Sequence, residues 1–257
     1  MEEIKTAPIL YSKGSNNQAV LILHGFAINI EQTDMLFDFF RTKGYTVARP
    51  VFPGHDGTEE QLKKFGPKDW FIEAKKALAK LSEEVDSIHI VGISFGSNIG
   101  TSLCVEGNEK IKSLSLMEMP IFFNLKIWLI LNFIQPIFSL IGIDFIRKEG
   151  FFYRKNSVLR EGSFALVPVK IAGEIRNYVK RKTMKEIGKL KIPVLAIYAE
   201  KSDMVDNKKT TQYICEKLPA EQRKIYCAPI DNHDLSLLDD GGKIILLENV
   251  YKFISKL

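Results

Sequence analysis

The chain is predicted to be an α/β protein with a mostly parallel central sheet flanked by helices. Three observations predict this class. With 257 residues and 46% hydrophobic content, the chain can bury a large core. Short apolar runs alternate with amphipathic stretches. The alternation fails only between about residues 120 and 190, without an internal repeat or linker. We therefore expect one core from residues 1–119 and 186–257, with an inserted helical cap at 120–185.

The short apolar, β-branched runs are typical of strands buried in a sheet. In chain order they are Ile9–Tyr11, Ala19–Leu23, Thr46–Arg49, Ile88–Val91, Ile111–Leu116, Val194–Tyr198 and Lys224–Cys227. Helices are expected at Glu31–Lys43, Lys68–Glu84, Ser97–Val105, Asn207–Lys217 and Gly242–Lys256. Because only a short turn at residues 13–17 separates the first two strands, we expect these strands to form an antiparallel hairpin.

Residues 121–134 of the insert are far more apolar than the chain average. Polar residues interrupt this stretch, so no run approaches the roughly 18 apolar residues that a membrane span needs. At about 100° per residue, four polar side chains fall within an arc of about 80°: Asn124, Asn132, Gln135 and Ser139. The stretch therefore predicts a helix with a broad apolar face.

Charge and cysteine usage narrow the possible functions. A net charge of +5 is modest for a nucleic-acid binder, and no nucleic-acid-binding motif is present. The three widely spaced cysteines indicate neither a disulfide framework nor a zinc site. Residues 144–191 hold thirteen Lys or Arg against five Asp or Glu, which fits a solvated helix face or weak contact with an anionic membrane surface. Since residues 1–5 carry no secretory signal, a cytoplasmic location is expected.

The most informative motif is Gly92-Ile93-Ser94-Phe95-Gly96. It lies between a buried strand and the start of a helix, the context in which a G-x-S-x-G turn exposes a nucleophilic serine. Both glycines are explained if a Cβ at Gly92 or Gly96 would clash with the neighbouring backbone. A tight turn alone would also explain the five residues, so the rest of the site decides between the two interpretations.

A serine nucleophile needs a base to take its proton and an acid to orient that base. His233 follows the last expected strand, from which an imidazole can reach back over the sheet edge, although a solvated loop histidine is the plain alternative. Asp203 follows the strand at 194–198 and is the expected acid. Asp206 is its rival, and would equally serve as the N-cap of the next helix. His55 is the alternative base.

Acyl transfer also needs donors for an oxyanion. One is the amide of the residue after the nucleophile, Phe95, and the second is expected from a loop after an early strand. That loop is His24-Gly25-Phe26-Ala27, in which Gly25 lets the backbone turn so that the Phe26 amide faces inward.

With these residues the chain resembles the α/β-hydrolase superfamily, more narrowly its carboxylesterases and monoacylglycerol-lipase-like serine hydrolases. The resemblance rests on residues 21–26, 53–55 and 92–96, the Asp203 loop and His233, in that order. It implies a triad of Ser94, Asp203 and His233, an oxyanion hole from the Phe26 and Phe95 amides, and ester hydrolysis with no cofactor and no metal. The chain departs from the family at Ser97, where relatives carry a small Gly or Ala, and at Asp56, which leaves the orientation of His55 open.

The resemblance further implies that the insert is a lid over an acyl pocket, with a small-molecule ester of an apolar acyl group as the substrate. Trp128 and Phe133 of the insert, with Gly25 and His55, are then the candidate substrate-binding residues. Simple packing of the lid on the core is the alternative. A thioesterase or another acyl hydrolase shares this machinery, and a non-catalytic ligand-binding protein can share the fold. The complete set of site residues favours an enzyme, and a dehalogenase would need a carboxylate at Ser94.

Overall fold

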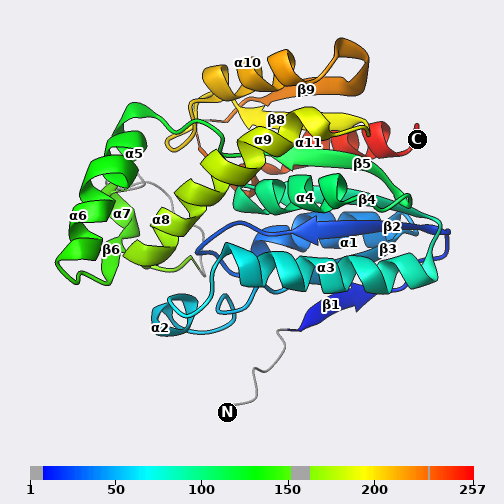
Figure 1. Ribbon diagram of the computed structural model, residues 1–257. Coiled ribbons are helices and arrows are strands. Elements are labelled where there is room, and N and C mark those ends of the chain that lie inside the picture. Colours follow the sequence, from blue (N-terminus) through cyan, green and yellow to red (C-terminus); the bar gives the residue numbers. More distant parts are fainter. Residues whose placement is uncertain (1–7, 152–162, 231) are drawn as a thin grey trace.

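The computed structural model describes residues 8–151, 163–230 and 232–257. Its centre is a seven-stranded sheet of order β1-β3-β2-β4-β5-β8-β9 (Figure 1). The strands are β1 Ile9–Ser12, β2 Gln18–Leu23, β3 Thr46–Pro50, β4 Ser87–Ile93, β5 Ile111–Met117, β8 Val194–Ala199 and β9 Arg223–Ala228. All neighbouring pairs are parallel except β1 with β3, so the mostly parallel α/β class expected from the sequence is confirmed.

The expected hairpin between β1 and β2 is wrong. β1 is antiparallel to its neighbour, but that neighbour is β3, which lies between β1 and β2. The connecting turn crosses the start of β3, where the amides of Ser15 and Asn16 both donate to the Gly44 carbonyl. A Cβ at Gly14 would lie 2.3 Å from that same backbone, so glycine permits the crossing.

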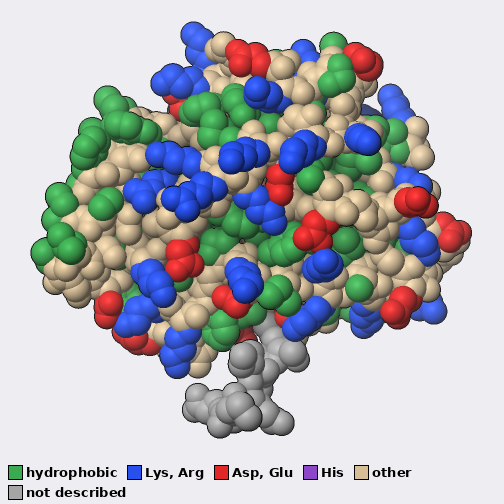
Figure 2. All heavy atoms as spheres, in the orientation of Figure 1, with side chains coloured by type: hydrophobic (Ala, Val, Ile, Leu, Met, Phe, Trp, Pro, Cys, Tyr) green, Lys and Arg blue, Asp and Glu red, His purple; other side chains and the backbone are tan. Residues whose placement is uncertain are grey.

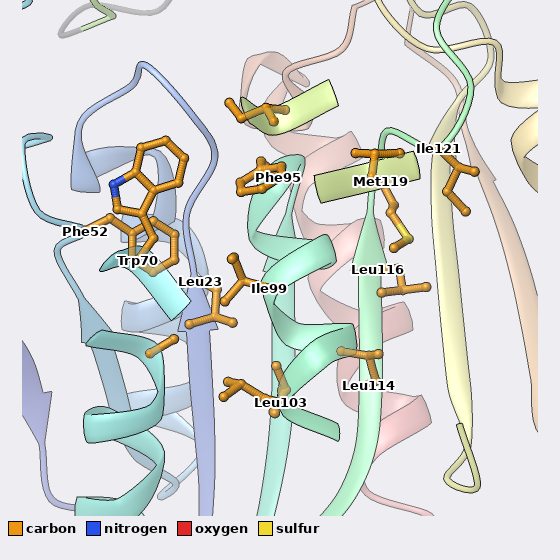
Figure 3. Close-up of a cluster of buried hydrophobic side chains, with 14 of the residues drawn as sticks. Leu23, Phe52, Trp70, Phe95, Ile99, Leu103, Leu114, Leu116, Met119 and Ile121 are labelled. Atoms are coloured by element: carbon orange, nitrogen blue, oxygen red, sulfur yellow. The ribbon is translucent and has the colours of Figure 1, made fainter. Parts of the chain in front are cut away.

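Helices cover both faces of the sheet. On one face lie α3 (Pro67–Glu84), α4 (Phe95–Glu106) and α10 (Asn207–Lys217), and on the other lie α1 (Asp34–Thr42) and α11 (Asp240–Ile254). Shorter helical turns are η1 Ile30–Thr33, α2 Glu59–Leu62, η5 Ala220–Gln222 and η6 Leu235–Leu237. Alternate residues of each central strand enter the two layers. Figure 3 shows the first layer, which runs from Leu103 and Leu114 up to Phe95 beside the end of β4.

The insert between β5 and β8 is mainly helical. It contains α5 Leu125–Leu129, the π-helical η2 Ile130–Ile134, α6 Gln135–Leu140, β6 Phe145–Arg147, α7 Lys148–Phe151, β7 Leu166–Pro168, α8 Val169–Tyr178, the π-helical η3 Val179–Thr183, α9 Met184–Glu186 and η4 Ile187–Lys189. Single bridges join it to the loops that follow β2 (Ile28 with Ser163) and β8 (Phe123 with Val205). The insert therefore covers the carboxyl ends of the strands, at the left of Figure 1. Within the described residues, no helix is both long enough and apolar enough to cross a bilayer.

Candidate active site

Ser94 stands at a sharp turn between β4 and α4, with φ of +48°. A Cβ at Gly92 would lie 2.5 Å from the Ser97 backbone, and one at Gly96 would lie 2.2 Å from the Leu23 carbonyl oxygen. The expectation that both glycines are required for steric reasons is confirmed. Ser97, which departs from the family pattern, donates from its hydroxyl to the Gly92 carbonyl at 2.6 Å. It thereby ties the two ends of the turn together.

His233 joins Ser94 to a buried carboxylate. Its Nε2 lies 2.8 Å from Ser94 Oγ, and its Nδ1 lies 2.9 Å from Glu118 Oε2. Because an ionised carboxylate can only accept, Nδ1 carries the ring proton and Nε2 is free to accept from the Ser94 hydroxyl. Both His233 and Glu118 are buried. A serine, a histidine and a carboxylate thus form one hydrogen-bonded series.

The carboxylate bonded to the His233 ring belongs to Glu118, whereas the sequence led us to expect Asp203 at this position. Asp203 Oδ1 instead accepts from the His233 backbone amide at 3.2 Å. The loop after β8 is drawn towards the insert, because the Asn124 amide donates to the Met204 carbonyl at 2.9 Å and Asn124 Nδ2 donates to the Asp203 carbonyl. Asp203 therefore supports the His233 loop while its carboxylate stays off the ring.

Asp206, the rival acid, is bonded elsewhere. Its side chain accepts from the Lys209 amide at 3.0 Å and caps the N-terminus of α10, the alternative role anticipated for it.

Glu118 is fixed in place by donors from the next strand and helix. It follows β5 directly, and its Oε1 accepts from the Ala199 amide at 2.5 Å and from Asn207 Nδ2 at 3.0 Å. Burial and the nearby Glu118 carboxylate raise the pKa of Tyr198 well above its ordinary value. The sequence holds a signal for Glu118, since it is the lone charged residue in the apolar run 114–121 at the end of a buried strand.

Both expected oxyanion donors lie beside Ser94. A Cβ at Gly25 would be 3.3 Å from Ser94 Cβ, so the loop after β2 passes directly over the nucleophile. The Phe26 amide has no hydrogen-bond partner among the described residues. Phe95 is the first residue of α4, where backbone N–H groups lack an intrahelical partner. Two amides are thus available at one side of Ser94.

Two buried histidines form hydrogen bonds with the backbone in and beside residues 24–27, which we call the oxyanion loop after the role expected for it. His24 Nε2 accepts from the Phe52 amide at 2.9 Å, and its Nδ1 donates to the Gly25 carbonyl at 2.7 Å. His55 Nε2 accepts from the Ala27 amide at 3.2 Å. Burial lowers the pKa of His24 to about 4, and burial together with His24 lowers the pKa of His55 well below its usual value. Both rings are therefore neutral, and His55 contacts the loop rather than the substrate cavity expected for it.

A cavity opens over Ser94 with a volume of about 70 Å³. Its polar side chains are Ser94, His233, Gln32 and Lys148, and Gly25 lines it as expected. The rest of the wall is apolar, with Leu131, Val167, Ala172 and Ile175 contributed by the insert. Among the described residues, no group of three or more His, Cys, Asp or Glu side chains is arranged to hold a metal ion.

Trp128 and Phe133 do not line this cavity. Their side chains are 42% and 56% exposed, and their rings contact each other at a centroid distance of 5.6 Å. The apolar face of the insert helix is wider than the surface it packs against. Ile127 and Leu131 take the inner positions, so Trp128 and Phe133 remain outside.

Backbone strain marks the same site. In the described part of the chain, the non-glycine residues with positive φ are Ala27 (+53°), Ser94 (+48°) and Glu118 (+53°). They follow β2, β4 and β5, three adjacent strands of the sheet. Residues in this region persist only where their surroundings hold them, and they cluster at functional sites. The loop after β2, the turn at Ser94 and the carboxylate bonded to His233 each carry one.

This fold and this arrangement of residues define the chain as an α/β-hydrolase fold protein. A metagenome-derived lipolytic enzyme of the LipS and LipT study superposes with a TM-score of 0.82, at 21% identity and 99% coverage of both chains. The monoacylglycerol lipase of Paleococcus ferrophilus gives a TM-score of 0.77 at 13% identity, covering 97% of this chain and 98% of that one. The carboxylesterase CesB of Bacillus subtilis gives 0.61 at 14% identity, covering 98% of this chain and 89% of that one.

Relatives in sequence carry similar names. A carboxylesterase of Bacillus subtilis is 34% identical over 97 residues, which are 37% of this chain and 39% of that protein. A thermostable monoacylglycerol lipase of Bacillus sp. strain H-257 is 26% identical over 80 residues, 31% of this chain and 32% of that protein. The chain thus matches less than two-fifths of either relative's length. No protein-family model matches it.

Proposed function

We propose that the chain is a serine hydrolase that cleaves carboxylic esters with an apolar acyl group. The observation that carries the proposal is the hydrogen-bonded series from Ser94 Oγ through His233 to Glu118, at 2.8 and 2.9 Å. A solvated loop histidine would have no reason to join a strained serine to a buried carboxylate. The esterases and lipases among the relatives and structural neighbours support the same class.

In the acylation step, Ser94 Oγ attacks the ester carbonyl carbon while His233 Nε2 takes the hydroxyl proton. The carbonyl oxygen becomes an oxyanion, which the Phe26 and Phe95 amides stabilise by hydrogen bonds. Glu118 holds the Nδ1 proton and stabilises the imidazolium that forms. When the tetrahedral intermediate collapses, the C–O bond to the alcohol breaks and His233 returns the proton to the departing alkoxide.

Deacylation repeats these steps with water. His233 removes a proton from water, the resulting hydroxide attacks the acyl carbon, and collapse of the second tetrahedral intermediate releases the carboxylic acid and restores the Ser94 hydroxyl. None of these steps requires a cofactor.

The proposed acyl group is apolar and short. The insert's contribution to the cavity wall is aliphatic except for Lys148, which favours a hydrocarbon chain. A volume of about 70 Å³ is below the roughly 150 Å³ of an engineered cavity that admits benzene. We therefore propose that short acyl groups fit the cavity as it stands and that longer ones require the insert to move.

The test is hydrolysis of p-nitrophenyl esters with acyl chains from acetyl to decanoyl. We expect turnover by the wild type and a loss on the order of a millionfold in kcat for Ser94→Ala, with the fold intact by circular dichroism. The matched control is Ser82→Ala, a half-buried serine near the end of α3 whose Oγ donates to the Leu78 carbonyl at 2.8 Å, which we expect to keep wild-type activity. No hydrolysis by the wild type would favour a non-catalytic ligand-binding protein. Turnover confined to acyl thioesters would favour a thioesterase.

A further inference from the structure

Gly25 and Ala27 flank Phe26 in the oxyanion loop. The backbone N–H and carbonyl groups of both residues are hydrogen-bonded to side chains. The Gly25 and Ala27 amides donate to their acceptors at 2.9 and 3.2 Å, and the Gly25 and Ala27 carbonyls accept at 2.7 and 2.9 Å. The four side chains, in the same order, are Gln32, His55, His24 and Lys148. Three of them belong to the core, and Lys148 alone comes from the insert.

These bonds bear on the direction of the Phe26 amide. The Gly25 carbonyl and the Phe26 N–H belong to one planar peptide group, so the bond from His24 to the carbonyl turns the N–H the opposite way. At the other end of the loop, Ala27 has φ of +53°, a conformation that an alanine keeps only where its surroundings hold it. The Ala27 carbonyl accepts from Lys148 Nζ at 2.9 Å and from the Phe164 amide at 3.2 Å, both in the insert.

Lys148 is buried where it donates to the Ala27 carbonyl. Its side chain is 5% exposed and forms part of the cavity wall that also contains Ser94. A buried ammonium is unfavourable unless polar groups compensate it. Burial lowers the pKa of Lys148 to about 8, against the opposing effect of the nearby Asp234 carboxylate. Among the residues that the structure describes, neutral His55 and, across the cavity, His233 also face it.

We propose that Lys148 is a positioning residue for ester hydrolysis: by holding the Ala27 carbonyl, its ammonium keeps the oxyanion loop in the conformation that points the Phe26 amide at the reacting carbonyl. The proposal rests on the proposed function. It means that the oxyanion hole is complete only when the insert is seated on the core, since the fourth support of the loop comes from the insert.

The test compares Lys148→Met, Lys148→Arg and the control Lys170→Met in steady-state hydrolysis of p-nitrophenyl acetate. Lys170 lies on α8 of the insert with its side chain 75% exposed. Loss of an oxyanion donor costs roughly 100- to 1,000-fold in kcat, so a displaced donor is expected to cost about tenfold or more. We expect this loss in kcat for Lys148→Met, with KM changed less than about twofold. Lys148→Arg, which keeps a charged donor, and Lys170→Met are expected to stay near wild type.

The pH dependence of kcat distinguishes a positioning role of Lys148 from a general contribution of Lys148 to protein stability. Below a pH of about 8, Lys148 is charged and its bond to Ala27 is charge-assisted, which makes such a bond roughly twice as strong as a neutral one. As the pH rises through 8 the charge is lost, so wild-type kcat is expected to fall. Lys148→Arg stays protonated and is expected to lack this fall.

Inhibition by a trifluoromethyl ketone, which forms a tetrahedral adduct, is expected to weaken in Lys148→Met by the same factor as kcat/KM. Unchanged kcat and inhibition in a folded Lys148→Met variant would overturn the proposal. A change confined to KM would also overturn it, because Lys148 would then bind substrate. If Lys148→Met does not fold, persistence of the fall near pH 8 in Lys148→Arg overturns the proposal instead. Absence of any wild-type hydrolysis would refute the proposed function itself.

Discussion

At the scale of single residues, the position of Glu118 is the main departure from what the sequence predicts. Asp203 follows a late strand and precedes His233, as the family pattern leads one to expect. The choice depends on which carboxylate reaches the imidazole, and that is decided by contacts distant in sequence. Glu118 receives its donors from residues 199 and 207, and the Asp203 loop is held by residue 124. No local pattern contains these pairings.

Replacing each carboxylate with the neutral amide of the same shape distinguishes the role of Glu118 from that of Asp203. We expect Glu118→Gln to lower kcat by roughly 10³- to 10⁴-fold, because an amide cannot hold the productive tautomer or stabilise imidazolium. Asp203→Asn keeps an oxygen that can accept from the His233 amide, so we expect a loss below about tenfold. The measurement is kcat for p-nitrophenyl butyrate at pH 7.5, with thermal unfolding as the check on folding. The reverse ranking would restore Asp203 as the acid.

Other residues of the site were predictable because their chemistry is local. Ser94 lies in a five-residue turn whose glycines are dictated by contacts within a few residues and with the adjacent β2. His233 is singled out by its place after the last strand. The roles of His24 and His55 could not be foreseen, since each contacts backbone from another segment, at residues 52 and 27.

At the scale of elements, the orientation of the insert helices was the least predictable feature. Its sequence shows a broad apolar face but not which part of that face turns inward. Residues 130–134 are π-helical, which changes the angle between successive side chains from that of an α-helix. Leu131 is 3% exposed and lines the cavity, whereas Leu129, two residues before, is 43% exposed and does not.

This pair of leucines provides a matched test of the acyl pocket. Leu131→Ala removes three carbons from the cavity wall, so we expect the preferred acyl chain to lengthen by two or three carbons. Each newly buried substrate methylene is worth about 0.8 kcal/mol, or about fourfold in kcat/KM. Leu129→Ala and Trp128→Ala are expected to leave the chain-length profile unchanged. The measurement is kcat/KM across the p-nitrophenyl ester series, and equal profiles for Leu131→Ala and wild type would remove Leu131 from the pocket.

The strands of the central sheet were predictable, but the one pairing that the sequence suggested, β1 with β2, was wrong. The seven expected strands are the seven strands of the central sheet, because short runs of apolar and β-branched residues are a local property of the sequence. The neighbour of β1 was not predictable, because strand order depends on which strand the connection at residues 13–17 crosses. This connection crosses the start of β3.

At the scale of the whole molecule, the surface has two distinct regions. Figure 2 shows hydrophobic side chains gathered over α5 and α6 at the left and Lys and Arg side chains over α8 to α9. The first includes Leu125, Leu140 and Ile141, and the second includes Lys180, Arg181 and Lys185. Part of the basic stretch 144–191, residues 152–162, lies outside the described residues. Weak contact with a membrane surface through this side stays a prediction, and so does the cytoplasmic location.

The residues of the candidate site come together because the strands that carry them are neighbours in the sheet. Residues with positive φ at the ends of β2, β4 and β5 place Ala27, Ser94 and Glu118 at one edge of the sheet, and the loop after β9 brings His233 to Ser94 and Glu118. We propose that this assembly makes Ser94 a nucleophile.

The most direct measurement of that claim is covalent labelling with a fluorophosphonate, followed by intact mass and peptide mapping. We expect one adduct per wild-type chain, located on Ser94, with none on Ser94→Ala and much slower labelling of Glu118→Gln. An adduct on another residue, or equal labelling of Ser94→Ala and wild type, would contradict it.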